Sequence, residues 1–180
     1  MLFRSLGGML AFCADCNEDQ DCVDAGTGTA CTLDAMSQNA ICTSGELGST
    51  CMSDAACADG KCGPVIEIPI PGIIPDLCNE CDDSMDCMGG NLCSPVFDLQ
   101  MFSGQKSCVA PGSVMNDNLC PEGPDGPMVC MSGHCNSATI MGIVEVFICG
   151  ECDDDGDCEP GQTCMPAEAS MNGINGSVCA

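Results

Sequence analysis

The chain has 180 residues, of which 27 are Asp or Glu and only three are Lys or Arg, so its formal net charge is −24. Three cations, Arg4, Lys61 and Lys106, cannot neutralise a phosphate backbone, which excludes nucleic acid as a partner, and the negative charge opposes binding to anionic lipid. No apolar run reaches the roughly 18 residues needed to span a bilayer, so we expect no membrane insertion.

Cysteine is the most unusual part of the composition, with 21 residues in the chain. A chain with this much like charge and few large apolar side chains would ordinarily be disordered. Small modules that cannot bury enough apolar surface use disulfides instead, and disulfides persist in oxidising compartments. The composition therefore predicts a secreted or cell-surface protein.

The first expected element is an apolar segment over residues 1–12. It is too short for a signal peptide, and similar apolar segments, residues 72–77 and 143–148, precede later Cys-x2-Cys pairs. We expect residues 1–12 to form a strand that docks onto a second copy of the chain, so that the partner is the protein itself. The side chains expected to make this contact are Leu2, Phe3, Leu6, Leu10 and Phe12.

The cysteines that follow recur in phase. Three Cys-x2-Cys pairs are each followed by an Asp-Cys pair, at successive spacings of 65 and 71 residues, and self-similarity at such a period indicates tandem repeats. The predicted domains are a repeat over residues 13–77, a second over 78–148 and a truncated third over 149–180.

Each full repeat divides into a half with five cysteines and a half with three. Because an odd half cannot pair all its thiols internally, we expect bridges that cross to a neighbouring half and tie the repeats into an elongated rod. The connectivity stays open. The cysteines expected to form disulfides are Cys13, Cys16, Cys22, Cys31, Cys42, Cys51, Cys57, Cys62, Cys78, Cys81, Cys87, Cys93, Cys108, Cys120, Cys130, Cys135, Cys149, Cys152, Cys158 and Cys164.

The total number of cysteines is odd as well. One of them must be free, bridged to a second chain, or partnered by sequence outside these 180 residues. Since the third repeat is incomplete, we expect Cys179 to be this free or intermolecular cysteine.

Regular secondary structure should be sparse. Residues 65–71 and 143–148 are rich in β-branched side chains and predict short strands that lead into the next repeat. The 22 glycines and 11 prolines favour turns elsewhere. The expected fold class is therefore a small disulfide-rich tandem repeat, mostly loops and turns with short β-strands or hairpins and little or no helix.

Acidic residues cluster between the second and third cysteines of each repeat. Ca²⁺ prefers six to eight hard oxygen ligands, which makes these loops candidate calcium sites. The simpler alternative is a solvated acidic turn in which the Asp before the third cysteine caps local backbone amides. The candidate ligands are Asp19, Asp21, Asp82, Asp83, Asp86, Asp153, Asp155 and Asp157.

Other chemistry has little support in the sequence. Haem attachment needs a His directly after Cys-x2-Cys, and a structural zinc site generally needs two such pairs or paired histidines. The only histidine, His134, aligns with Lys61 and is expected to be an exposed turn tip. No catalytic constellation can be assembled, so we expect no enzyme activity and no cofactor other than Ca²⁺.

The spacing Cys-x2-Cys-x2-Asp/Ser-x-Asp-Cys-x5-Cys, clearest at Cys78 to Cys93 and Cys149 to Cys164, resembles the Dickkopf N-terminal cysteine-rich type of repeat, as in predicted secreted bacterial repeat proteins. The first repeat departs from this pattern, with eight residues between Cys22 and Cys31. The resemblance implies a secreted disulfide module and supplies no catalytic residues.

Together these features predict a structural subunit of an extracellular filament, sheath or surface appendage that assembles through its repeat ends. The alternative is a secreted module for Ca²⁺-dependent adhesion or for binding a protein ligand.

Overall fold

The computed structural model describes residues 2–6, 10–33, 39–58, 61–67, 75–98, 101, 103–170 and 173–180, and side chains from residue 15 onward. Its elements are short, as expected for a chain interrupted by so many glycines and prolines. The strands are β1 (Leu2–Leu6), β2 (Leu10–Ala14), β3 (Ala30–Leu33), β4 (Ala40–Thr43), β5 (Lys61–Gly63), β6 (Leu77–Asn79), β7 (Leu92–Asp98), β8 (Ser103–Val109), β9 (His134–Ile140), β10 (Val144–Gly150), β11 (Cys164–Met165), β12 (Glu168–Ser170), β13 (Gly173–Asn175) and β14 (Val178–Cys179). The helices are α1 (Asp19–Ala25) and α2 (Asp125–Val129), with 3-10 turns η1 (Asp54–Ala56), η2 (Met88–Gly90) and η3 (Asp155–Asp157).

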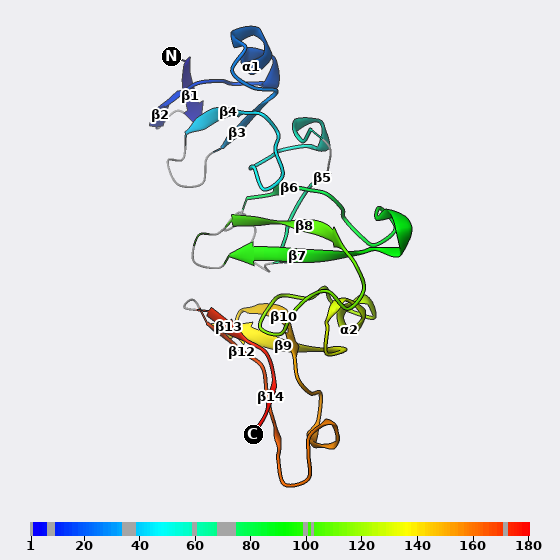
Figure 1. The fold of residues 1–180 in the computed structure, drawn as a ribbon. Coiled ribbons are helices and arrows are strands. Elements are labelled where there is room, and N and C mark those ends of the chain that lie inside the picture. Colours follow the sequence, from blue (N-terminus) through cyan, green and yellow to red (C-terminus); the bar gives the residue numbers. More distant parts are fainter. Residues whose placement is uncertain are drawn as a thin grey trace. The chain divides into compact units, whose positions relative to one another are not determined.

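All the strands that the structure describes pair in antiparallel twos. The pairs are β1–β2, β3–β4, β5–β6, β7–β8, β9–β10, β11–β14 and β12–β13 (Figure 1). Short hairpins with two short helices confirm the predicted class of a small disulfide-rich, mostly β and loop fold. The elongated rod stays a prediction.

Ten disulfides divide the chain into five consecutive modules of four cysteines, which we number 1 to 5 (residues 16–42, 51–78, 81–108, 120–149 and 152–179). In every module the first cysteine bonds the third and the second bonds the fourth. The bridges are Cys16–Cys31 and Cys22–Cys42, Cys51–Cys62 and Cys57–Cys78, Cys81–Cys93 and Cys87–Cys108, Cys120–Cys135 and Cys130–Cys149, and Cys152–Cys164 and Cys158–Cys179.

Each module is built on one antiparallel pair of strands, which we call its hairpin; in module 5 this pair is β11–β14, and the strands β12 and β13 lie between its two strands in the sequence. Its third and fourth cysteines lie directly opposite each other on the two strands, so their side chains share one face. They do not bond each other; each bonds a cysteine of the preceding loop, which is thereby fastened to the hairpin at two points. The opposed pairs are Cys31 and Cys42, Cys62 and Cys78, Cys93 and Cys108, Cys135 and Cys149, and Cys164 and Cys179.

The disulfides also revise the predicted repeat boundaries. Cys57–Cys78 and Cys130–Cys149 cross from a three-cysteine half into the next repeat, which is the crossing that the odd counts predicted. The boundaries predicted before Cys78 and Cys149 therefore fall inside modules 2 and 4. The Cys-x2-Cys pair contains the last cysteine of one module and the first of the next.

The predicted odd cysteine was wrong. Cys179 bonds Cys158 in module 5. Because twenty cysteines pair among themselves, Cys13 has no cysteine left in this sequence to bond. Cys13 precedes Cys16 by three residues, just as Cys78, the fourth cysteine of module 2, precedes Cys81, the first cysteine of module 3. Cys13 therefore holds the position that a fourth cysteine holds in the other modules.

Two compact units divide the chain. The first comprises Met1–Pro64 with Gly72–Glu80 and holds module 1 and most of module 2. The second comprises Val65–Pro71, which is part of module 2, with Cys81–Ala180, and holds modules 3 to 5. The second unit has an apolar core made largely by hairpin β9–β10, with Ala169 of β12 and Ile174 of β13 packed against it. The buried residues of this core are Ile66, Leu119, Ala138, Ile140, Val146 and Ile148.

The predicted strands fare differently. Strand β10 covers most of residues 143–148 and confirms that prediction. Residues 65–67 form no strand. The side chains of Val65 and Ile66 are nevertheless buried, because they pack into the interior of the unit. Residues 68–71 lie outside the described part.

The N-terminal segment folds back on itself. Strand β1 pairs with β2, with Phe3 opposite Cys13, so the single docking strand predicted for residues 1–12 is a hairpin instead. The side chains of Leu2, Phe3, Leu6, Leu10 and Phe12 lie outside the described residues, and their contact with a second copy stays a prediction.

Candidate functional site

The acidic loops use their carboxylates to hold their own backbone. Oδ2 of Asp157 accepts hydrogen bonds from the N–H groups of Asp153 and Asp154, at 2.8 and 3.2 Å. Oδ2 of Asp86 and of Asp21 accept in the same way from residues four and three positions earlier, at 2.9 and 3.5 Å and at 2.7 and 3.3 Å. The amide-capping alternative for these three residues is therefore confirmed.

In modules 1, 2, 3 and 5 a further side chain locks the loop after the first cysteine to the hairpin. The residue three positions after the first cysteine accepts the backbone N–H of the third cysteine. The acceptors are Asp19 for Cys31 at 2.8 Å, Asp54 for Cys62 at 2.9 Å, Ser84 for Cys93 at 3.0 Å and Asp155 for Cys164 at 2.8 Å. Sequence reasoning missed Asp54 and Ser84, although their constant offset from the first cysteine marks them.

These contacts bear on the predicted calcium ligands. Asp19, Asp21, Asp86, Asp155 and Asp157 all accept backbone N–H groups, which occupies one oxygen of each. A further candidate, Asp83, accepts the N–H of Met85 at 2.7 Å. Asp82 is exposed, and Asp153 faces His134. Calcium binding stays a prediction, whereas the structural use of these carboxylates is observed.

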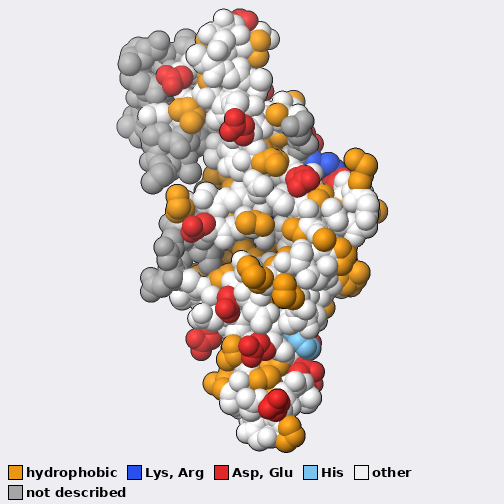
Figure 2. Space-filling model, viewed as in Figure 1, with side chains coloured by type: hydrophobic (Ala, Val, Ile, Leu, Met, Phe, Trp, Pro, Cys, Tyr) orange, Lys and Arg blue, Asp and Glu red, His pale blue; other side chains and the backbone are white. Residues whose placement is uncertain are grey.

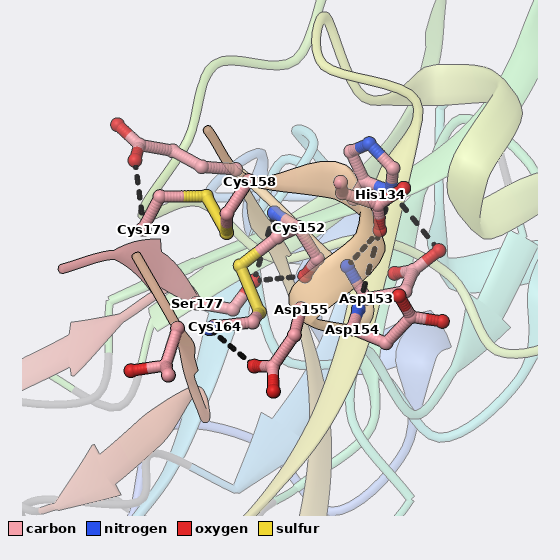
Figure 3. The surroundings of a disulfide bond; sticks show 12 residues. His134, Cys152, Asp153, Asp154, Asp155, Cys158, Cys164, Ser177 and Cys179 are labelled. Carbon is pink, nitrogen blue, oxygen red and sulfur yellow. Dashed lines mark hydrogen bonds and ion pairs between the residues drawn. A yellow bond between two sulfur atoms is a disulfide. The ribbon is translucent and has the colours of Figure 1, made fainter. Parts of the chain in front are cut away.

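His134 is not the exposed tip that the sequence predicted. Its side chain is 23% exposed, and Nδ1 lies 3.0 Å from Oδ2 of Asp153 and 3.8 Å from Oδ2 of Asp157 (Figure 3). Strand β9 of module 4 begins at His134, so this contact joins module 4 to the acidic loop of module 5. The imidazole forms an ion pair there once it is protonated.

A buried polar contact joins the same two modules. The Ser177 hydroxyl donates to the Cys152 carbonyl at 2.5 Å (Figure 3). Nδ2 of Asn136 in module 4 donates to both residues, at 3.0 Å to Ser177 Oγ and 2.9 Å to the Cys152 oxygen. Ser177 is 1% exposed. Because the Ser177 hydroxyl and the Cys152 carbonyl both have hydrogen-bond partners, this contact fixes the last segment of the chain against module 4.

The environment of Asp157 predicts a pH dependence. The N–H of Asp153, and then that of Asp154, lower the pKa of the Asp157 carboxyl, with a smaller contribution from His134. A carboxyl whose pKa is lower in the folded state stabilises the fold above its unfolded pKa of about 3.9, and this stabilisation is lost as the pH falls through the folded pKa.

We therefore expect Asp157→Asn to lower the thermal unfolding temperature at pH 7, and we expect the difference from the unmodified chain to shrink as the pH falls below about 4. Melting curves recorded without reductant from pH 7 to pH 2 measure this. Glu159→Gln, an exposed residue on the same loop, is the control and should leave the curve unchanged. If the unfolding temperature of Asp157→Asn stayed below that of the unmodified chain by the same amount down to pH 2, the charge-based explanation would be contradicted.

The second compact unit also contains a pocket of about 260 Å³. Its apolar wall is formed by buried Val65, Ile66, Leu119 and Val146. Carboxylates from modules 3 and 4 and from Glu67 surround it. No sequence pattern pointed to this pocket, because its lining residues come from several stretches of the chain that are far apart in the sequence. The lining acidic residues are Glu67, Asp82, Asp83, Glu122, Asp125 and Glu145.

Cysteine sulfurs gather in several clusters, and the disulfide bridges account for them. In groups such as Cys16, Cys22 and Cys42 the sulfurs lie within 4.8 Å of one another, but each belongs to a disulfide and carries no thiolate. Among the described residues, no helix is long and apolar enough to cross a membrane.

Comparison with known proteins returned no match: no family model, no curated protein and no solved structure is significantly similar to this chain. The resemblance to Dickkopf-type repeats stays a prediction. The ten disulfides are typical of extracellular domains.

Proposed function

We propose that this protein is a structural subunit of an extracellular filament, sheath or surface appendage, joined to further copies through its N-terminal hairpin. The observation that carries the proposal is the closure of the modules. Each of the five satisfies its four cysteines internally, so the chain is a series of small units that are covalently closed and resist unfolding.

Cys13 supports the same proposal. It occupies the place of a fourth cysteine, yet the position opposite it on β1 is Phe3 rather than a third cysteine. In an assembly of this chain alone, the only cysteine that Cys13 can bond is Cys13 of a second copy. The building block is then a symmetric covalent dimer, and assembly beyond it needs a second, non-covalent contact.

Electron microscopy of the native material and mass spectrometry under non-reducing conditions test this function. We expect filaments, and we expect Cys13 to be recovered in a disulfide between chains. Cys13→Ser should remove the covalent dimer and leave the ten internal bridges intact. Deletion of residues 1–12 combined with Cys13→Ser should yield folded monomers. Dispersed monomers carrying a free Cys13 thiol, or filaments that survive the deletion, would overturn the proposal.

A further inference from the structure

We propose that the pocket in the second compact unit binds a lysine or arginine side chain presented by a basic peptide segment of another protein. This inference does not depend on the filament proposal, because it rests on the pocket alone. Its evidence is the combination of an apolar wall and an acidic rim in one concave site.

The apolar wall belongs to the buried part of the unit. Val65, Ile66, Leu119 and Val146 are each less than 10% exposed, and three of them, Ile66, Leu119 and Val146, are part of the apolar core. The half-buried ring of Phe147 adds an aromatic surface. Such a wall favours an aliphatic stem, which loses its contact with water when it packs there.

The rim carries strong negative charge. Six carboxylates line the pocket with one cation, Lys106. Asp125 is held in place because Oδ2 accepts the Ser84 hydroxyl at 2.6 Å, while Ser84 Oγ accepts the Cys93 N–H at 3.0 Å. Glu122 and Glu145 are exposed and reach solvent at the rim. A cationic head group is attracted to such a rim, whereas phosphate or a carboxylate ligand is repelled.

An apolar stem that ends in a cation is the chemistry of lysine and arginine. The chain itself has few such side chains, since its only basic residues are Arg4, Lys61 and Lys106. In the face drawn in Figure 2, acidic side chains are spread widely while blue side chains occupy one place. Charge complementarity therefore indicates a basic partner protein rather than a second copy.

The test uses the full chain and the peptide acetyl-Arg-Ile-Arg-amide, with the uncharged citrulline analogue beside it. Isothermal titration measures affinity, and methyl NMR locates the site. We expect the arginine peptide to shift the methyl signals of Leu119 and Val146 and to leave that of exposed Val23, in module 1, unchanged. The citrulline analogue should bind at least about fivefold more weakly, because it lacks the charges that pair with the rim.

Three variants separate a specific site from general attraction to an acidic protein. Glu122→Gln with Glu145→Gln should weaken the arginine peptide at least about fivefold, whereas the matched pair Glu46→Gln with Glu159→Gln, which removes equal charge outside the pocket, should not. Lys106→Gln should tighten binding, an effect that general damage to the fold cannot produce. Equal weakening by both pairs, or citrulline binding as tight as arginine binding, would overturn the proposal.

Discussion

Replacing Cys130 and Cys149 together by alanine is expected to lower the free energy of unfolding of the second compact unit by roughly 2–5 kcal/mol. The bridge closes a separation of 19 residues and fastens the loop that contains α2 to strand β10. It is also part of a buried apolar cluster with Leu92, Cys120 and Val129. Removal of the bridge therefore increases the conformational entropy of the unfolded chain, which favours unfolding. It also leaves unfilled volume in the cluster.

The matched variant replaces Cys158 and Cys179, the same second-to-fourth bridge of module 5. That bridge closes a similar separation of 21 residues, but its cysteines are half-buried and belong to no apolar cluster described here. Guanidinium unfolding without reductant should show a smaller loss for this pair than for Cys130 and Cys149. Equal losses would mean that burial of the bridge contributes nothing beyond loop closure.

Gly150→Ala is expected to destabilise the junction between modules 4 and 5 by roughly 1–3 kcal/mol, because a new Cβ would overlap a packed backbone. That Cβ would overlap Ser177 Oγ and lie 2.5 Å from the Ser177 backbone nitrogen. The backbone nitrogen of Ser177 cannot move away by a change of rotamer, as a flexible side chain could. The substitution therefore displaces the segment whose hydroxyl binds the Cys152 carbonyl.

Amide hydrogen exchange measures this effect at the residues concerned. In Gly150→Ala, the N–H of Glu151, which donates to the Ser177 carbonyl at 2.7 Å, should exchange faster than in the unmodified chain. Gly156→Ala is the control, because its Cβ would meet only the Asp154 carboxylate, which can move. Unchanged protection of Glu151 in Gly150→Ala would show that Ser177 does not hold this junction.

Parts of this architecture could be predicted because they follow from counting and spacing. Each half with an odd number of cysteines required a bridge to a neighbouring half, and Cys57–Cys78 and Cys130–Cys149 are such bridges. The recurring Asp before the third cysteine pointed to amide capping, which Asp21, Asp86 and Asp157 carry out. Such short-range contacts span three or four residues, so local sequence is enough to place them.

Spacing alone does not identify the odd cysteine. The Cys-x2-Cys pair is the most conspicuous motif of the chain, and repeats that begin at this pair leave Cys179 in an incomplete repeat. The hairpin register decides otherwise. Cys164 and Cys179 are opposed on β11 and β14, as are the third and fourth cysteines of every other module, so Cys179 completes module 5.

The disulfide-rich, mostly β and loop class and the tandem repetition could be predicted from the amino-acid sequence, because they depend on composition and spacing. For the loop aspartates the sequence offered two roles, calcium binding and amide capping. The pairing of the cysteines, the contact of His134 with Asp153, and the pocket formed by residues 65–67 with modules 3 and 4 are visible only in the folded structure. Those features depend on which segments the folded backbone brings together, and many chain paths are compatible with the same cysteine spacing.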